Sequence, residues 1–328
     1  MRFLILFLAI SSIVFSSNYL SNCTNISYPG DYVLSDDLHF AKTPRTSWDR
    51  GDVCLRITSD NVNLNCNGHY IIGSDENDTY GIYTYDTQNF SLKNCNVSSF
   101  NTCINLHDSY HVSIDRNSLF CRVLLGDFPI NSSSEVSITN NFFINSSLFD
   151  EMSANLTVIN NTFTNGGIYV GLDSNSIVFG NTITHNSSYC SAFGSSAIGA
   201  VVSNNSFFSL CSISLDGEGL VFSNNSISSG SFNGLYIAYL KNSQIINNTV
   251  CSPSLNRSTS YTNKYFDIYG AWEGNKNIYL NNTCDTSNPQ HICTKSCSGS
   301  DNLSKSNCPL SFLLLSIIFL FVLRGKIQ

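Results

Sequence analysis

The sequence predicts an all-β protein built as a single-stranded parallel β-helix of about ten coils. Three observations favour this fold: a short motif recurs, apolar residues alternate within each copy, and an Asn keeps its place in each copy. The motif is clearest at Val136–Phe143 and returns at Leu156–Phe163, Ser176–Ile183, Ala200–Phe207 and Leu220–Ile227. A motif that returns every ~20 to 45 residues is the signature of a solenoid or a propeller.

The alternation of apolar residues indicates strands. In each copy the apolar side chains recur with a period of two, which places them on one face of a strand. A second alternating run fills each interval, at Gly81–Tyr85, Gly167–Leu172, Ser212–Leu215 and Gly234–Tyr239. The intervals contain no amphipathic helix. Strands joined by short turns without crossover helices cannot form a doubly wound sheet, whereas a coil can stack them in parallel.

The recurring Asn predicts a ladder inside the coil. A bend between two strands turns a side-chain amide inward, and that amide can donate to its equivalent one coil away. Because a buried amide without a partner is costly, its recurrence favours stacking. The aligned position falls on Cys95 in one copy, and on an Asn in the others: Asn67, Asn117, Asn141, Asn161, Asn181, Asn205, Asn225, Asn248 and Asn282.

The series Cys54–Ile71 and Gly81–Phe100, together with the NNTF and NNSI copies, resembles the right-handed parallel β-helix repeats of the pectin-lyase-like superfamily. The resemblance covers about residues 50–284 and is nearest in character to surface-exposed β-helix proteins of archaea and bacteria. It implies a right-handed coil. It does not imply one activity, because this fold carries lyases, hydrolases, epimerases, adhesins and inert spacers.

Both ends of the chain indicate export. Residues 1–17 have the basic start and apolar core of a signal peptide, although an uncleaved anchor would look similar. The apolar run Leu310–Leu323 is followed by Arg324 and Lys326, as expected for a short membrane anchor or a removable sorting tail. We therefore predict a protein of the secretory pathway, held at the cell surface by its C-terminus. The predicted segments are a signal peptide (1–17), an N-terminal cap or entry strand (18–53), the β-helix (54–284), a Cys-containing stalk or cap (285–308) and the hydrophobic helix (309–324).

The thirteen Cys of an exported chain predict disulfides in preference to a metal site. Pairs that lie about one coil apart are candidate bridges, although sequence alone leaves the connectivity open. They are Cys66 with Cys95, Cys103 with Cys121, Cys190 with Cys211, and Cys251 with Cys284.

Sixteen Asn-x-Ser/Thr acceptors predict N-glycosylation. Those inside the repeat, such as Asn160 and Asn224, are equally explained as by-products of a repeat rich in Asn, Ser and Thr. The candidates are Asn22, Asn25, Asn77, Asn96, Asn155, Asn186, Asn256 and Asn302.

Charge argues against a nucleic-acid partner. Only 12% of residues are charged and the net charge is −7, so no basic stripe is expected. The membrane, glycans and other cell-surface proteins are the predicted partners. The six His are scattered and Met152 is the only Met beyond the predicted signal peptide, so neither a metal nor another cofactor is expected. We interpret His107 and His111 as solvated surface side chains.

Four carboxylates stand at similar places before a following strand. An acidic file of this kind could bind Ca²⁺ or supply acid–base pairs to a polysaccharide enzyme. Asp is equally suited to making the turn between two strands. Since the basic residues of the coils do not share a phase, no catalytic constellation is predicted. The four are Asp86, Asp108, Asp173 and Asp216.

Tyrosines recur in the second strand of the coil, where some side chains must point outward. A file of exposed Tyr would form a carbohydrate-binding or adhesive face, whereas inward Tyr would fill the core. The sequence thus predicts a surface protein with a structural or adhesive role, and the alternative is a polysaccharide lyase or hydrolase. The candidate ligand-facing tyrosines are Tyr83, Tyr85, Tyr169, Tyr236 and Tyr239.

Overall fold

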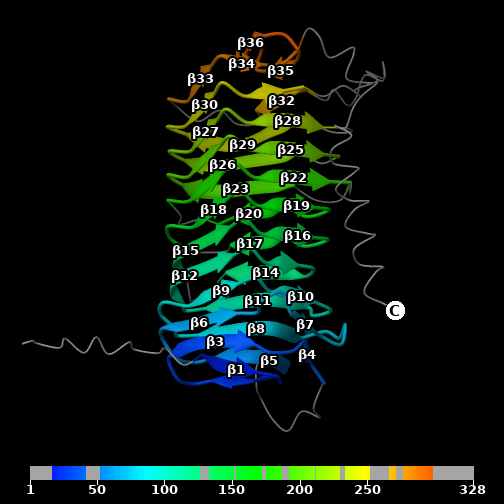
Figure 1. Cartoon of the computed structure of the whole chain (residues 1–328). Coiled ribbons are helices and arrows are strands. Elements are labelled where there is room, and N and C mark those ends of the chain that lie inside the picture. The colour runs from blue at the N-terminus through cyan, green and yellow to red at the C-terminus, as the bar shows by residue number, and fades with distance from the viewer. Residues whose placement is uncertain are drawn as a thin grey trace, which may run out of the picture. The chain divides into compact units, whose positions relative to one another are not determined.

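The computed structural model consists of strands joined by short turns (Figure 1). It describes residues 17–41, 52–125, 133–150, 153–171, 175–186, 192–210, 212–229, 233–251, 266–270 and 276–297. Every regular element within these ranges is a strand, which confirms the all-β prediction. The same ranges contain no helix that is long and apolar enough to cross a membrane. The predicted hydrophobic helix and all but the last residue of the predicted signal peptide lie outside them.

The strands form two compact units that divide after Thr162. In both units the chain coils so that successive strands join three parallel sheets, named here A, C and B in chain order. The pairings of β8 with β11 and of β26 with β29 are typical. The two strands between the members of each pair belong to the other two sheets, so every third strand returns to the same sheet. This arrangement confirms the predicted parallel β-helix.

In the first unit, sheet A contains β1 (Asn18–Leu20), β3 (Gly30–Leu34), β6 (Val62–Asn65), β9 (Ser91–Lys93), β12 (Tyr110–Asp115), β15 (Ser134–Thr139) and β18 (Thr157–Ile159). Sheet C contains β4 (Leu38–His39), β7 (Tyr70–Ile72), β10 (Asn96–Ser98), β13 (Ser118–Leu119) and β16 (Phe142–Ile144). Sheet B contains β2 (Thr24–Ile26), β5 (Asp52–Ile57), β8 (Thr79–Tyr85), β11 (Thr102–His107), β14 (Arg122–Leu125) and β17 (Leu148–Asp150).

In the second unit, sheet A contains β21 (Ile177–Phe179), β24 (Val201–Ser203), β27 (Val221–Ser223), β30 (Gln244–Ile246) and β33 (Ile278–Leu280). Sheet C contains β22 (Thr182–His185), β25 (Ser206–Ser209), β28 (Ser226–Ser229), β31 (Thr249–Val250), β34 (Asn282–Thr283) and β36 (Cys293–Lys295). Sheet B contains β20 (Ile168–Val170), β23 (Phe193–Ile198), β26 (Ile213–Glu218), β29 (Leu235–Lys241), β32 (Ile268–Gly270) and β35 (Ser287–Asn288). Strand β19 (Thr162–Thr164) spans the point of division.

Alternate residues of each strand fill the interior of the coil. In β12, for example, Val112 and Ile114 are almost completely buried while Ser113 between them faces outward. Core residues of different sheets also contact one another across the interior, since the rings of Phe193 in β23 and Phe207 in β25 lie 5.6 Å apart. The predicted period of two therefore holds because one face of every strand is removed from water.

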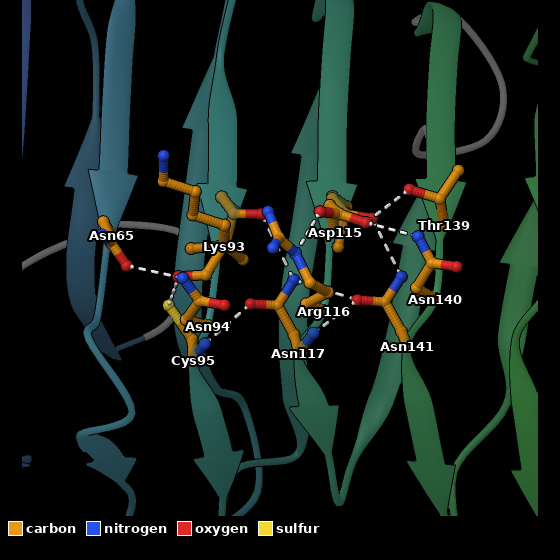
Figure 2. A network of polar contacts seen from close by, with 12 residues as sticks. Asn65, Lys93, Asn94, Cys95, Asp115, Arg116, Asn117, Thr139, Asn140 and Asn141 are labelled. Carbon is orange, nitrogen blue, oxygen red and sulfur yellow. Dashed lines mark hydrogen bonds and ion pairs between the residues drawn. The ribbon is translucent and has the colours of Figure 1, made fainter.

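The Asn ladder runs along the turn between sheets A and C. In the first unit, the backbone N–H and the Nδ2 of Asn117 donate to Oδ1 of Asn141 at 2.8 and 3.0 Å (Figure 2). Asn141 donates in the same way to Asn161, at 2.9 and 3.0 Å. The second unit repeats the pattern from Asn181 through Asn205, Asn225 and Asn248 to Asn282, at 2.9 to 3.1 Å.

Asn67 does not belong to this ladder, so its predicted position was wrong. Its side chain is exposed and its φ is 52°, because it lies within a turn that is two residues longer than the turn at Cys95. Cys66 occupies the inward position instead and forms a disulfide with Cys95. The Oδ1 of Asn117 then accepts the backbone N–H of Cys95 at 2.9 Å, which begins the ladder.

Within the described residues, five disulfides join neighbouring coils. Two of them, Cys66–Cys95 and Cys103–Cys121, are the predicted pairs. The predicted pair of Cys251 with Cys284 was wrong: the structure contains Cys251–Cys297 and Cys284–Cys293, because the chain after Cys284 makes a further coil that brings Cys297 back over Cys251. Cys23–Cys54 was not predicted. Cys190 and Cys211 lie outside the described residues.

The two predicted caps are themselves coils where the structure describes them. Strands β1, β2 and β4 pair in parallel with β3, β5 and β7, so residues 18–39 continue the sheets of the first unit. Strands β35 and β36 pair with β32 and β34 and do the same in the second unit. The described parts of the terminal segments therefore continue the three sheets.

Candidate functional site

All five candidate tyrosines lie on strands of sheet B. In the first unit, Tyr85 is 48% exposed whereas Tyr83 is only 3% exposed, so Tyr83 is not the accessible side chain that we predicted. In the second unit, Tyr169 and Tyr239 are 43% and 50% exposed, and Tyr236 is half-buried. The exposure of Tyr85, Tyr169 and Tyr239 agrees with the predicted outward phase of these side chains.

The outer face of sheet B in the first unit gathers several polar side chains around Tyr83 and Tyr85. Pairing of β8 with β11 sets Tyr83 beside Asn105 and Tyr85 beside His107. Pairing of β5 with β8 sets Arg56 beside Tyr83. These five residues, which we call the β8 cluster, come from three consecutive coils and share one face.

Ring contacts hold the β8 cluster together. The guanidinium carbon of Arg56 lies 5.4 Å from the centre of the Tyr83 ring, a cation–π contact. The rings of Tyr85 and His107 stack with centres 5.0 Å apart and planes inclined by 24°. The Nδ1 of His107 is also 3.4 Å from Oδ2 of Asp108. The exposed Tyr85 ring is therefore supported from behind by a buried imidazole.

Asn105 is the unusual member of the cluster. Its side chain is 1% exposed, yet neither Oδ1 nor Nδ2 has a hydrogen-bond partner within the part of the chain that the structure describes. A buried amide without partners costs free energy, so such a group calls for an explanation. A ligand that donates to Oδ1 and accepts from Nδ2 would supply one.

The sequence indicated only part of this cluster. Arg56 and Asn105 were not singled out, although their phase relative to Tyr83 could have identified them. His107 was interpreted as a solvated side chain, which was wrong: it is 1% exposed because Tyr85 stacks on it. His111 does lie at the surface, 53% exposed, and contacts Glu135.

The four predicted carboxylates do not form one file. Asp86 and Asp108 follow β8 and β11 on adjacent coils with φ of 50° and 48°, as expected for turn residues. Asp216 lies inside β26, opposite Tyr239, and not in a turn. Asp173 lies outside the described residues. Calcium binding by these carboxylates, left open by the sequence, is not tested by the structure.

One group of metal-ligand type occurs among the described residues, formed by Asp267, Asp285 and Cys297. The sulfur of Cys297 is bonded to Cys251 and is not available as a ligand. The Oδ2 of Asp267 accepts the backbone N–H groups of Asp285 and Thr286 at 2.8 and 2.9 Å. The group is thus explained as the closure of the last coil.

A polar hollow of about 370 Å³ lies beside the first unit's sheet B. Its walls include Asp75, Glu76, Phe120 and Arg122. The Arg122 guanidinium is held in place, because its Nε donates to Thr102 at 3.0 Å. The sequence did not predict this hollow. Basic residues that recur at one position of the repeat would have indicated it, and Arg122 does not belong to such a series.

Aromatic side chains also stack on sheet B of the second unit. The rings of Tyr236 and Tyr269, on adjacent strands, lie 5.8 Å apart and nearly parallel at 14°. Phe266 stacks on Tyr269 at 5.8 Å. The Tyr169 ring covers Gly194, where an added Cβ would lie 2.8 Å from the ring. This face is therefore aromatic but has fewer polar groups than the β8 cluster.

The fold corresponds to that of known proteins. The model of a family described as "Right handed beta helix region" matches residues 80–250. Among solved structures, the A-module of mannuronan C-5 epimerase AlgE6 from Azotobacter vinelandii has a TM-score of 0.62 at 8% identity, covering 86% of this chain and 88% of that one. PfbA, a surface adhesin of Streptococcus pneumoniae, has a TM-score of 0.49 at 12% identity over 84% of this chain and 80% of that one.

An endo-xylogalacturonan hydrolase from Aspergillus tubingensis has a TM-score of 0.43 at 14% identity over 87% of this chain and 89% of that one. No curated protein matches in sequence. The family match confirms the right-handed coil, and the likeness to the epimerase module concerns the fold alone.

Proposed function

The chain belongs to the right-handed β-helix family, and we propose that it is an exported surface protein that binds glycans at the β8 cluster. The observation that carries this proposal is the buried, unpartnered amide of Asn105, which lies beside Tyr83 on the strand that also carries the half-exposed ring of Tyr85. Sugar rings present an apolar face and a rim of hydroxyl groups. An aromatic ring beside fixed donors and acceptors matches both.

Each member of the cluster has a part in this proposal. Tyr85 stacks on the apolar face of a pyranose, and its orientation is set in advance by the His107 ring at 5.0 Å. Asn105 is 1% exposed, so a sugar reaches its two polar atoms only when the side chains over them move aside on binding, and the sugar hydroxyl groups then satisfy both atoms. Arg56 adds a positive charge over Tyr83, which favours glycans that carry a carboxylate.

The location is supported by the five disulfides, because such bonds form and persist in oxidising compartments. Retention at the membrane through the hydrophobic segment 309–324 remains part of the proposal. A glycan-binding face held at a surface would let the protein adhere to polysaccharides or to glycosylated cells.

A glycan array probed with the full chain tests the binding. We expect binding to a restricted set of oligosaccharides, with those containing uronic acids strongest, and at least a ~10-fold loss of affinity in Tyr85→Ala and in Asn105→Ala, equivalent to ~1.4 kcal/mol. Tyr19→Ala is the matched control, because Tyr19 is 73% exposed in β1 and far along the chain from the cluster. An array that stays blank, or equal losses in all three variants, would contradict the proposal.

A polysaccharide-active enzyme is the second candidate, and a specific observation favours it. Tyr85, His107 and Asp108 bring a phenol, an imidazole and a carboxylate together on one face. Such groups can act as general acid and base. A panel of polysaccharides assayed for reducing ends and unsaturated products distinguishes the two functions. Turnover that is lost in His107→Ala would establish the enzyme, and binding without turnover would establish the adhesin.

A further inference from the structure

The turn between sheets A and C places two neighbouring asparagines in opposite environments. The second Asn of each pair belongs to the buried ladder, whereas the first is exposed and adopts a left-handed backbone conformation. In the second unit the first residues are Asn204, Asn224, Asn247 and Asn281, each with φ of 56°. Only Gly, Asn and Asp adopt this conformation routinely, which explains why Asn recurs there.

Each of these four exposed asparagines begins an Asn-x-Ser/Thr acceptor. The required hydroxyl belongs to Ser206, Ser226, Thr249 and Thr283 respectively. These hydroxyl residues are direct register partners on adjacent strands of sheet C. The acceptors are thus aligned on successive coils, about 4.8 Å apart.

The side chains of these four asparagines make no hydrogen bond among the described residues. The equivalent Asn140 of the first unit differs in both respects. Its Nδ2 donates to Oδ1 of Asp115 at 2.9 Å (Figure 2), and the residue two positions later is Phe142, so it is not an acceptor. The acceptor sequence and the free amide occur together.

We propose that Asn204, Asn224, Asn247 and Asn281 form a row of N-glycosylation sites on the edge between sheets A and C. In the attachment step, the amide nitrogen forms a bond to the anomeric carbon of a lipid-pyrophosphate-linked oligosaccharide. The bond from that carbon to the pyrophosphate oxygen breaks, and the amide loses one proton. Attachment leaves the core intact because the ladder uses only the second Asn of each pair.

The position of this row is compatible with ligand binding elsewhere. In a three-sided coil, the edge between sheets A and C lies opposite sheet B, whose outer face carries the aromatic side chains of the second unit. Glycans on the row would cover the turns and leave that face open. The acceptors of the repeat are then functional positions, and not by-products of its composition.

The test uses the full chain secreted from a eukaryotic host. Secreted protein is treated with peptide N-glycosidase in ¹⁸O-labelled water, which converts each glycosylated Asn to labelled Asp, and is mapped by mass spectrometry. We expect label at positions of the row, and loss of label at Asn224 in Ser226→Ala, which leaves both asparagines in place. Secreted protein without label at all four positions would overturn the proposal.

A second variant tests whether an Asn with a free amide at this turn is glycosylated once the acceptor sequence is complete. The double variant Asp115→Ala with Phe142→Thr releases the Asn140 amide from the Asp115 carboxylate and completes an acceptor at Asn140. Phe142 is 55% exposed, so the core is not altered. We expect new label at Asn140 in this variant. Its absence would show that a free amide at this turn is not sufficient, and would overturn the assignment.

Discussion

Replacing one ladder residue should have a large effect, and Asn141→Ala is the sharpest case. The Oδ1 of Asn141 accepts the backbone N–H of Asn117 at 2.8 Å, and its Nδ2 donates to the carbonyl of Ile114 at 2.9 Å. The side chain is 1% exposed, so water cannot replace these contacts. Alanine would leave a buried donor and a buried acceptor without partners.

The expected cost follows from those two groups. Each unsatisfied buried polar group costs ~1–3 kcal/mol, so the two together predict a loss of about 4 kcal/mol in the free energy of unfolding. The adjacent residue is the matched control. Asn140→Gly keeps the left-handed backbone at φ 57°, and loses only the exposed hydrogen bond to Asp115. We expect this control to change stability by less than ~1 kcal/mol.

Urea unfolding followed by far-UV circular dichroism measures both variants against the parent protein. The predicted difference is a large fraction of the ~5–15 kcal/mol that stabilises a typical protein, so it should be visible as a shift of the unfolding midpoint. If Asn141→Ala and Asn140→Gly were equally stable, the ladder would not contribute as argued, and the recurrence of its Asn would need another explanation.

Two further outcomes follow from single contacts. The backbone N–H of Tyr70 donates to the Asp37 carboxylate at 2.9 Å and lowers the pKa of Asp37. The ionised Asp37 therefore stabilises the fold above its unfolded pKa of ~3.9, and this contribution is lost as the pH falls through the folded pKa. Asp37→Asn should accordingly weaken the acid dependence of the thermal midpoint below about pH 4. A Cβ at Gly73 would overlap the backbone carbonyl of Ser99, so Gly73→Ala should cost about 3 kcal/mol or more in thermal or urea unfolding. Gly68→Ala has open space around it and a φ of 86°, so it should cost only ~1–2 kcal/mol.

The period of the repeat was sufficient to predict the coil, because burial of alternate side chains and stacking of the Asn are local rules that every coil obeys. Prediction was wrong where a coil departs from the common length. Two additional residues in the turn after β6 moved Asn67 to the surface and put Cys66 in its place. The final coil likewise returned Cys297, and not Cys284, to Cys251.

The exposure of outward side chains could not be predicted in the same way. Tyr83 and Tyr85 have the same phase in one strand, yet they are 3% and 48% exposed. The difference comes from residues on adjacent coils, since Arg56 lies over Tyr83. Phase gives the face on which a side chain lies, whereas its accessibility depends on the size of its neighbours in the sheet.

The edge between sheets A and C and the outer face of sheet B therefore have different roles. Along the turn from sheet A to sheet C, the inward position holds Asn117, Asn141 and Asn161 in succession, because any other side chain would break the ladder. On the outer face of sheet B, the register partners in one row are Arg56, Tyr83 and Asn105. Their side chains differ in chemistry: a guanidinium, a phenol and an amide. No stacking rule restricts these positions, so they are free to specify a ligand. That freedom is the physical reason to seek recognition on sheet B.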